Sequence, residues 1–155
     1  MSAIVRSKKV SLESLYPKLN KKCRLCYKPL KGRQTSWCSE KCYFEAWEQA
    51  QIARGSSKEI RKALKRRDNE ICAKCGRDCA LVKRVFDKAG SSILKYEWRD
   101  RSLHPYYMVM RYFGFKPYGH TWEADHVIEI RDGGEHTLEN LQTLCIPCHK
   151  EKTKR

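Results

Sequence analysis

Apolar residues recur at helical spacing in the first half of the chain and predict two consecutive helices. Four of them fall at i, i+3, i+4 and i+7 and share one helical face: Tyr43, Ala46, Trp47 and Ala50. Ser39 is suited to cap the start of this helix, and Gly55 is suited to its end. A second helix is expected to run to about Asn69, because Ser56 and Glu59 have the spacing of a capping box. Its narrow apolar stripe consists of Ile60, Ala63 and Leu64.

A different pattern, typical of a hairpin, occupies the C-terminal part. Residues 120–130 form a strand-like run with β-branched side chains, and the turn 131–134, Arg-Asp-Gly-Gly, closes it. Residues 141–144 are expected to form the return strand, and Pro147 suits the first turn of a final helix. The pattern therefore predicts two strands followed by a helix, within an α+β fold.

The segment 76–119 between these regions is rich in aromatic and basic residues. We expect helix over parts of 80–112, with Pro105 near the start of one helix and Gly114 near an end. The aromatic residues are Phe86, Tyr96, Trp98, Tyr106, Tyr107, Tyr112, Phe113, Phe115 and Tyr118. Two interpretations stay open: they fill a small core, which is the commoner use, or they stack on unpaired bases beside basic side chains. The basic residues in question are Arg99, Arg101, Arg111 and Lys116.

Nine cysteines divide into two groups of four, with Cys79 left over. The first group reads C-x2-C-x11-C-x3-C and comprises Cys23, Cys26, Cys38 and Cys42. The second pairs two distant C-x2-C knuckles and comprises Cys72, Cys75, Cys145 and Cys148. Two residues between thiolates let both sulfurs reach one tetrahedral ion, so we expect two structural Zn²⁺ sites. The alternatives are disulfides or ordinary buried cysteines, and Cys79 is expected to be a free, partly buried thiol.

Composition favours small modules supported by metal over one large core. Charged residues make up 33% of the 155 residues, and the supply of apolar side chains is modest. We divide the chain into a basic N-terminal arm at 1–20, a four-cysteine zinc module at 21–55, and a C-terminal domain at 56–155. In this division the predicted helix after Ser56 is a helical linker, and 76–119 is a helical and aromatic insertion.

The net charge points to a polyanionic partner. Lys and Arg number 33 against 18 Asp and Glu, for a formal charge of +15, and neutralised phosphates release condensed counterions on binding. The predicted second helix has a basic face that is either a solvated surface or a phosphate contact: Lys58, Arg61, Lys62, Lys65, Arg66 and Arg67. We take Lys62, Lys65, Arg66 and, near the C-terminus, Lys152 as candidate nucleic-acid contacts.

The sequence carries no signal for membrane insertion or secretion. No run approaches the roughly 18 apolar residues that span a bilayer, and the N-terminus lacks an apolar run suited to export. We therefore expect an intracellular protein, in a compartment where thiols stay reduced.

The C-terminal part also concentrates residues suited to hydrolytic chemistry. Asp125 and His126 are neighbours on the predicted first strand, and His149 follows the zinc ligand Cys148 directly. A carboxylate with one imidazole suits a divalent ion that keeps open positions, while a second imidazole suits a general base. The alternatives are a surface imidazole at His126 and a turn or cap role for Asn140. His136 is a candidate for additional metal binding.

These residues together resemble the His-Asn-His (HNH) endonuclease family. The matching elements are Asp125-His126, the Gly133-Gly134 turn, Asn140-Leu141, and Cys145-x2-Cys148-His149-x2-Lys152-Thr153. The resemblance covers residues 70–155 and implies a small zinc-stabilised ββα-metal fold. From Trp37-Cys38-Ser39 onward the chain is also similar to the C-terminal nuclease domain of annealing-helicase/endonuclease repair proteins.

The resemblance implies a role for each matched residue. His126 matches the general base, Asp125 and His149 match the ligands of a catalytic Mg²⁺ or Mn²⁺, and Asn140 matches the residue that holds the base-bearing loop. Cys72, Cys75, Cys145 and Cys148 match the structural zinc.

The expected function is that of a metal-dependent DNA endonuclease that cuts one strand per active site. Its substrate would be duplex or branched DNA, and the protein would act as a monomer or a homodimer. The alternatives are a non-catalytic zinc module that binds nucleic acid and a protein-interaction adaptor.

Overall fold

The computed structural model describes residues 10–93, 105–116 and 119–154. A short helix α1 (Leu12–Leu15) precedes the cysteine loops, and two helices follow, α2 (Glu40–Ala53) and α3 (Ser57–Asp68). The helices α4 (Cys79–Ile93) and α5 (Pro105–Tyr112) come next. The C-terminal part contains β1 (Trp122–His126), a 3₁₀ turn (Ile130–Asp132), β2 (Leu141–Cys145) and α6 (Ile146–Thr153).

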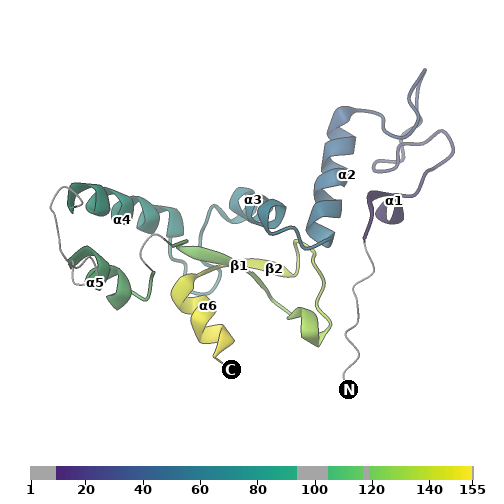
Figure 1. Cartoon of the computed structure of the whole chain (residues 1–155). Helices are drawn as coiled ribbons and strands as arrows, with labels where there is room; N and C mark the ends of the chain where they lie inside the picture. The colour runs from purple at the N-terminus through teal and green to yellow at the C-terminus, as the bar shows by residue number, and fades with distance from the viewer. Residues whose placement is uncertain (1–9, 94–104, 117–118, 155) are drawn as a thin grey trace.

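The hairpin lies between two helices. β1 and β2 pair antiparallel, with Asp125 opposite Gln142 and His126 opposite Leu141. Both α3 and α6 contact both strands, and Figure 1 shows these helices on opposite sides of the hairpin. The ββα arrangement predicted from the sequence is therefore present, and the fold is α+β.

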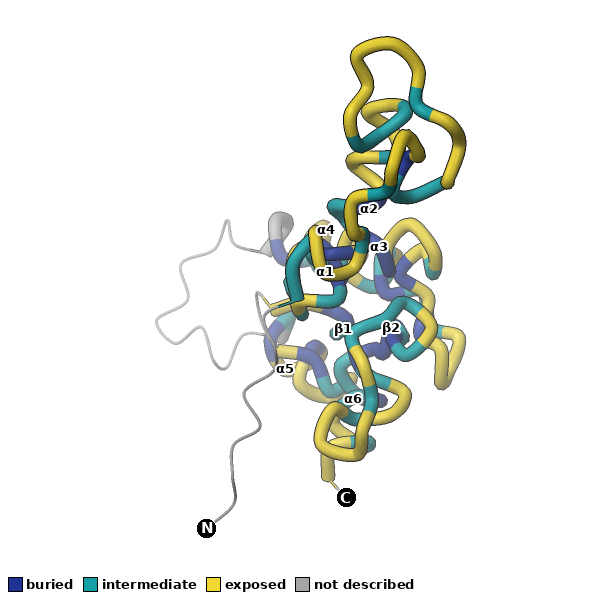
Figure 2. The backbone as a smooth tube through the Cα atoms, turned by 90° about the vertical axis from the view of Figure 1, so that its right-hand side faces the viewer, coloured by how far each residue is buried: buried dark blue, intermediate teal, exposed yellow. Residues whose placement is uncertain are grey.

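The main core is small and lies where α3 meets the hairpin. Leu64 of α3, together with Leu144 and Thr143 of β2, is essentially inaccessible to solvent. Ile60, Ala63 and Trp122 extend this cluster. Figure 2 shows the buried positions concentrated there, while the loops beyond α2 are mostly exposed.

The two N-terminal helices form as predicted, except for one cap. The Ser39 hydroxyl accepts a hydrogen bond from the Cys42 N–H at 3.3 Å, and Gly55 follows α2 with φ of +77°. The capping box expected at Ser56 is wrong, because the Ser56 side chain makes no capping hydrogen bond. The Ser56 N–H instead donates to the Gln51 carbonyl at 3.0 Å, so it is already satisfied by α2 and does not engage Glu59.

The first strand is shorter than the expected run of 120–130. β1 ends at His126, and beyond it the loop pairs with Asn140 in place of a partner strand. The Val127 N–H donates to the Asn140 carbonyl at 2.7 Å, and the Ile128 N–H donates to the Asn140 side-chain oxygen at 2.8 Å. A side chain that satisfies the backbone in this way ends the ladder early.

The insertion 76–119 contains the two helices α4 and α5, and Pro105 begins α5 as expected. Phe86 of α4 contacts Tyr106 and Phe115, with ring centroids 6.3 and 5.5 Å apart. Part of the aromatic set therefore fills a second small core, as the commoner interpretation held. The predictions for Tyr96, Trp98, Arg99, Arg101 and Tyr118 lie outside the described residues.

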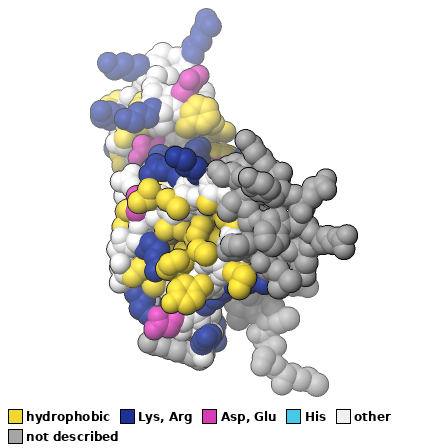
Figure 3. All heavy atoms as spheres, turned by 90° about the vertical axis from the view of Figure 1, so that its left-hand side faces the viewer, with side chains coloured by type: hydrophobic (Ala, Val, Ile, Leu, Met, Phe, Trp, Pro, Cys, Tyr) yellow, Lys and Arg dark blue, Asp and Glu magenta, His cyan; other side chains and the backbone are white. Residues whose placement is uncertain are grey.

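Other apolar side chains of the insertion face the solvent. Figure 3 shows them gathered on the face formed by α4 and α5. The exposed members are Leu81, Val85, Met108, Val109, Tyr112 and Phe113. Within the described part of the chain, no helix combines the length and apolar character needed to cross a membrane.

Side-chain hydrogen bonds connect the C-terminal end of α3 to β2 and to the loop before β2. The Arg67 guanidinium donates to the carbonyls of Leu138 and Leu141, the latter at 2.8 Å. The buried Thr143 hydroxyl donates to the Asp68 carboxylate at 2.8 Å. Hydrogen bonding from Arg67 lowers the pKa of Asp68, so this carboxylate stays charged and able to accept.

We expect Arg67→Met to destabilise the protein more than Arg66→Met. The first change removes the charged donor of the Leu138 carbonyl and of the Leu141 carbonyl in β2, and the loss of hydrogen bonds to a charged group costs about 1.5–3 kcal/mol. Arg66 only forms a surface ion pair with Glu48, worth about 0–1 kcal/mol. Urea unfolding followed by circular dichroism measures both changes. Equal losses of stability in the two variants would contradict the assigned role of Arg67.

Candidate active site and zinc clusters

The first cysteine group comes together in the N-terminal loops. The ligand sulfurs of Cys23, Cys26, Cys38 and Cys42 all lie within 4.8 Å of one another. The Cys38 sulfur is 3.5 Å from the sulfurs of both Cys26 and Cys42. Tetrahedral zinc with Zn–S bonds of about 2.3 Å requires sulfur separations of about 3.8 Å. The group therefore fits a structural zinc ion.

The second group joins parts of the chain that are distant in sequence. Cys72 and Cys75 follow α3, Cys145 ends β2, and Cys148 lies in α6. The sulfurs of Cys75 and Cys145 are 3.7 Å apart, and all four lie within 4.8 Å of one another. Burial opposes ionisation of Cys72, but backbone hydrogen bonds from Cys145 and Cys75 lower its pKa to about 6. A thiolate is the form that binds zinc, and this group also fits a structural zinc ion.

The ninth cysteine is separate from both clusters. Cys79 is fully buried and free, and its thiol donates to the Arg77 carbonyl at 3.6 Å. Burial raises the pKa of Cys79 to about 12, so its thiol stays protonated. Cys79 is free, as predicted, but it is fully buried where a partly buried thiol was expected.

Asp125 and His149 converge from β1 and α6. The Asp125 Oδ1 atom is 3.9 Å from the His149 Nε2 atom, and Asp125 is only 9% exposed. The other carboxylate oxygen of Asp125 accepts from Gln142 at 2.9 Å and from the Lys152 ammonium at 2.6 Å. Asp125 Oδ1 is therefore the oxygen directed towards His149.

This pair has the chemistry of a site for a hard divalent cation. Octahedral coordination at about 2.1 Å places adjacent ligand atoms about 3.0 Å apart and opposite ones about 4.2 Å apart. The separation of 3.9 Å lies between these two distances, so the two side chains would need to approach by about 0.9 Å to become adjacent ligands of one ion. One carboxylate and one imidazole leave most coordination positions to water and to a phosphate oxygen, as catalytic use requires.

His126 ends β1 and faces a second imidazole. Its Nε2 atom lies 2.9 Å from the Nδ1 atom of His136. Burial, followed by the neighbouring His136, lowers the pKa of His126, which favours the neutral form that accepts protons. His136, expected as an extra metal ligand, thus lies against His126.

Asn140 holds the loop that follows His126. Its amide nitrogen donates to the carbonyls of Ile128 and Glu135, both at 2.9 Å, and its oxygen accepts from Ile128. Gly134 is required here, since a Cβ atom would lie 1.9 Å from the Ile128 oxygen and 2.7 Å from the Asn140 amide nitrogen. The loop therefore depends on the Gly-Gly turn and on the asparagine together.

The candidate phosphate contacts of α3 are exposed but already have partners. Lys62 pairs with Glu59 at 3.7 Å, Lys65 with Glu70 at 2.5 Å, and Arg66 with Glu48 at 2.6 Å. Lys152 lies in the active site on Asp125. Their role in binding nucleic acid stays a prediction.

Two partners in the site were missed by sequence reasoning. Gln142 could have been found, because it stands directly opposite Asp125 in the hairpin register. The contact of His136 with His126 has no local signal, since it depends on how the loop folds back across ten residues.

Comparison with known proteins agrees with this site. Residues 114–155 match the HNH endonuclease family, and the chain belongs to that family. It is 31% identical over 138 residues to the DNA annealing helicase and endonuclease ZRANB3 of Mus musculus, covering 83% of this chain. The Homo sapiens protein of the same name is 31% identical over 133 residues, covering 79% of the chain.

The chain spans about 12% of the length of these curated relatives. No solved structure matches it.

Zinc content tests the two clusters. We expect two zinc ions per chain in the wild type, one for each cysteine group, and one in Cys72→Ser. Cys79→Ser is the matched control, because Cys79 is equally buried but lies outside both groups, and it should retain both ions. Native mass spectrometry distinguishes these states. Loss of an ion from Cys79→Ser alone would contradict the assignment.

Proposed function

We propose that this chain is a metal-dependent DNA endonuclease that hydrolyses one strand per active site. The observation that carries the proposal is the convergence of Asp125 and His149, 3.9 Å apart, with His126 following Asp125 directly on β1. Membership of the HNH endonuclease family supports the reaction class. The relatives named DNA annealing helicase and endonuclease support DNA as the substrate.

His126 is the general base in this proposal. Its neutral imidazole takes a proton from the water that attacks the phosphorus atom in line with the leaving 3′ oxygen. Asp125 and His149 would hold Mg²⁺ or Mn²⁺, which supplies charge stabilisation at the phosphate and the leaving oxygen. Gln142 and Lys152 fix the Asp125 carboxylate by hydrogen bonds to Oδ2, and Asn140 fixes the loop after His126.

Each chain has one set of these residues, which hydrolyses one DNA strand at a time. Cleavage of both strands of a duplex would therefore need a second protomer or a second nick, and the protein acts as a monomer or a homodimer. The zinc clusters and the buried free thiol support an intracellular setting, where thiols stay reduced.

Nicking of supercoiled plasmid tests the general base. We expect His126→Ala to lower the Mg²⁺-dependent rate by about 10²–10⁴-fold, the usual contribution of a general base. Affinity for DNA and zinc content should stay at wild-type values, because His126 belongs to neither cysteine cluster. The matched control is His120→Ala, which removes an exposed imidazole outside the site and should cut normally.

The same assay separates the alternatives. A wild-type protein that binds DNA but never nicks it, with Mg²⁺ or Mn²⁺ present, would identify a non-catalytic zinc module. Cleavage by His126→Ala at the wild-type rate would show that the base is a different group.

A further inference from the structure

The loops around the first zinc cluster carry a large share of the positive charge. Between residues 18 and 41 the sequence has eight basic side chains and a single acidic one, Glu40. The basic residues, which we call the zinc-knuckle surface, are Lys18, Lys21, Lys22, Arg24, Lys28, Lys31, Arg33 and Lys41. All except Arg24 are exposed. The local net charge of +7 compares with +15 for the whole chain.

These charges form no ion pairs within the described part of the chain. In the described residues, none of the eight side chains joins an ion pair, whereas Arg61, Lys62, Lys65, Arg66 and Arg67 of α3 all do. Arg24 lies over the ring of Trp37, 5.6 Å from its centroid. Four thiolates and one Zn²⁺ in the first cluster would together add a charge of about −2, which leaves most of the positive charge uncompensated. Clustered like charges repel one another and cost stability, so their arrangement favours an external anion.

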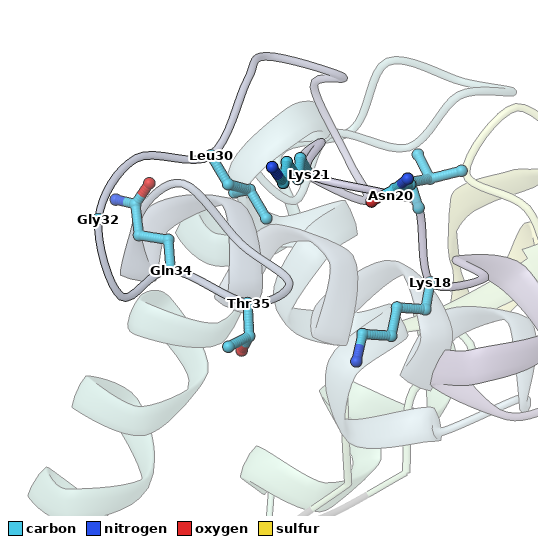
Figure 4. Close-up of a pocket in the computed structure, with 8 residues that line it drawn as sticks. Lys18, Asn20, Lys21, Leu30, Gly32, Gln34 and Thr35 are labelled. Atoms are coloured by element: carbon cyan, nitrogen blue, oxygen red, sulfur yellow. The ribbon is translucent and has the colours of Figure 1, made fainter.

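The surface is also hollowed. A cavity of about 700 Å³ opens between the loops at 18–21 and 30–35. Figure 4 shows that Lys18, Lys21, Asn20, Gln34 and Thr35 border it. Ammonium, amide and hydroxyl groups are the donors that contact phosphate oxygens in nucleic-acid complexes. The lining therefore suits a phosphodiester backbone.

We propose that the zinc-knuckle surface binds the phosphate backbone of the DNA substrate and anchors it independently of sequence. The proposal rests on the proposed nuclease function for its choice of DNA. Binding here would release counterions, so each lost phosphate contact lowers the slope of log K against log salt by about 0.9. On α3, by contrast, Lys62, Lys65 and Arg66 must each give up an internal partner before they gain a phosphate.

Two triple variants of the full chain, each removing three positive charges, test the anchor. The first is Lys18→Gln/Lys21→Gln/Lys31→Gln, and the control on α3 is Lys62→Gln/Lys65→Gln/Arg66→Gln, whose three residues all form ion pairs. Fluorescence anisotropy on a labelled duplex, without divalent metal and over a range of KCl, gives affinity and salt slope. We expect the first triple to bind at least 10-fold more weakly, with a slope smaller by about 2–3, and the control to change far less.

Equal or greater weakening in the α3 triple would overturn the anchor. An unchanged salt slope in the first triple variant, measured with its zinc retained, would also overturn the anchor. If that triple loses zinc, Lys28→Gln/Arg33→Gln provides the same measurement with two charges removed. Because these are binding measurements, they stand whether or not the protein cleaves DNA.

A separate observation concerns the partner of His126. His136 uses Nδ1 to contact His126 Nε2 at 2.9 Å, and its opposite edge packs on Gly55 at the end of α2. A Cβ atom on Gly55 would lie 2.8 Å from His136 Nε2 and 3.1 Å from Cε1. The His136 ring is thus held between the zinc-module helix and the general base.

We infer that His136 is a positioning residue for His126, and that α2 fixes it through Gly55. A hydrogen bond between two imidazoles needs one donor and one acceptor. When His126 Nε2 donates to His136 Nδ1, His126 Nδ1 keeps its lone pair for the attacking water. This inference also rests on the proposed function.

A glycine comparison tests the contact with α2. Gly55 and Gly76 both have positive φ, +77° and +69°, but a Cβ atom on Gly76 meets nothing within 4 Å. Alanine at either position therefore strains the backbone, and only Gly55→Ala displaces His136. We expect Gly55→Ala to lower the single-turnover rate at saturating DNA at least 10-fold, because small misplacement of a catalytic group costs up to about 10²-fold. Gly76→Ala, compared at equal zinc content, should stay near wild type.

Substitutions at His136 complete the test. His136→Ala should lower the same rate without changing zinc content, and His136→Asn should restore it, because an asparagine side chain places a polar atom near the Nδ1 position. Asparagine also lacks the ring atoms Nε2 and Cε1, which a Cβ atom on Gly55 would meet. The double variant Gly55→Ala/His136→Asn should therefore cleave DNA faster than Gly55→Ala alone. Equal rates for Gly55→Ala and Gly76→Ala, or no recovery in the double variant, would overturn the inference.

The tautomer of His126 provides a readout besides activity. Nitrogen-15 shifts of its imidazole should report a proton on Nε2 in the wild type and a mixture in His136→Ala. An unchanged tautomer in that variant counts against the positioning role even if the protein does not cleave DNA.

Discussion

The second cysteine cluster is the constraint on which the active site depends. It joins the knuckle after α3 to the point where β2 becomes α6, bringing together cysteines 70 residues apart. Cys145 caps α6 and Cys148 lies within it, so the cluster fixes how this helix leaves the hairpin. His149, the next residue, is thereby directed at Asp125 on β1. A core this small would not hold an eight-residue helix in place by packing alone.

The two regions of positive charge have different physical situations. Basic residues of α3 form ion pairs with carboxylates or donate hydrogen bonds to backbone carbonyls. Arg67 and Asp68 bind the helix to β2. Their charge contributes to the internal structure of the domain. The basic residues around the first zinc cluster form no ion pairs among the described residues, in contrast to those of α3, so they stay available to an anion from outside. Net charge alone does not distinguish these situations, because it ignores where the counter-charges lie.

The sequence predicted the features that follow from local spacing. The C-x2-C knuckles, the helical stripe of Ile60, Ala63 and Leu64, and the hairpin before α6 are all present. The errors arose where an unexpected group accepted a backbone N–H. The Gln51 carbonyl accepts from the Ser56 N–H, and Asn140 accepts from the residues that follow His126, where β1 ends. The pairing of Asp125 with His149 was predicted and is present, while the catalytic roles stay predictions. The contact of His136 with His126 was not predictable, because it needs the tertiary position of a loop.

The contact at Gly55 also bears on how the two zinc modules relate. Had α2 been a passive tether, its end would need no close fit with the nuclease loop, and any residue tolerant of positive φ would serve. Instead the space beside Gly55 is filled by the ring of His136, and the same ring contacts His126. The end of the N-terminal module therefore supports His136, which in turn contacts the proposed general base. In this arrangement, a change in the position of α2 reaches the His126 imidazole through a single intervening side chain.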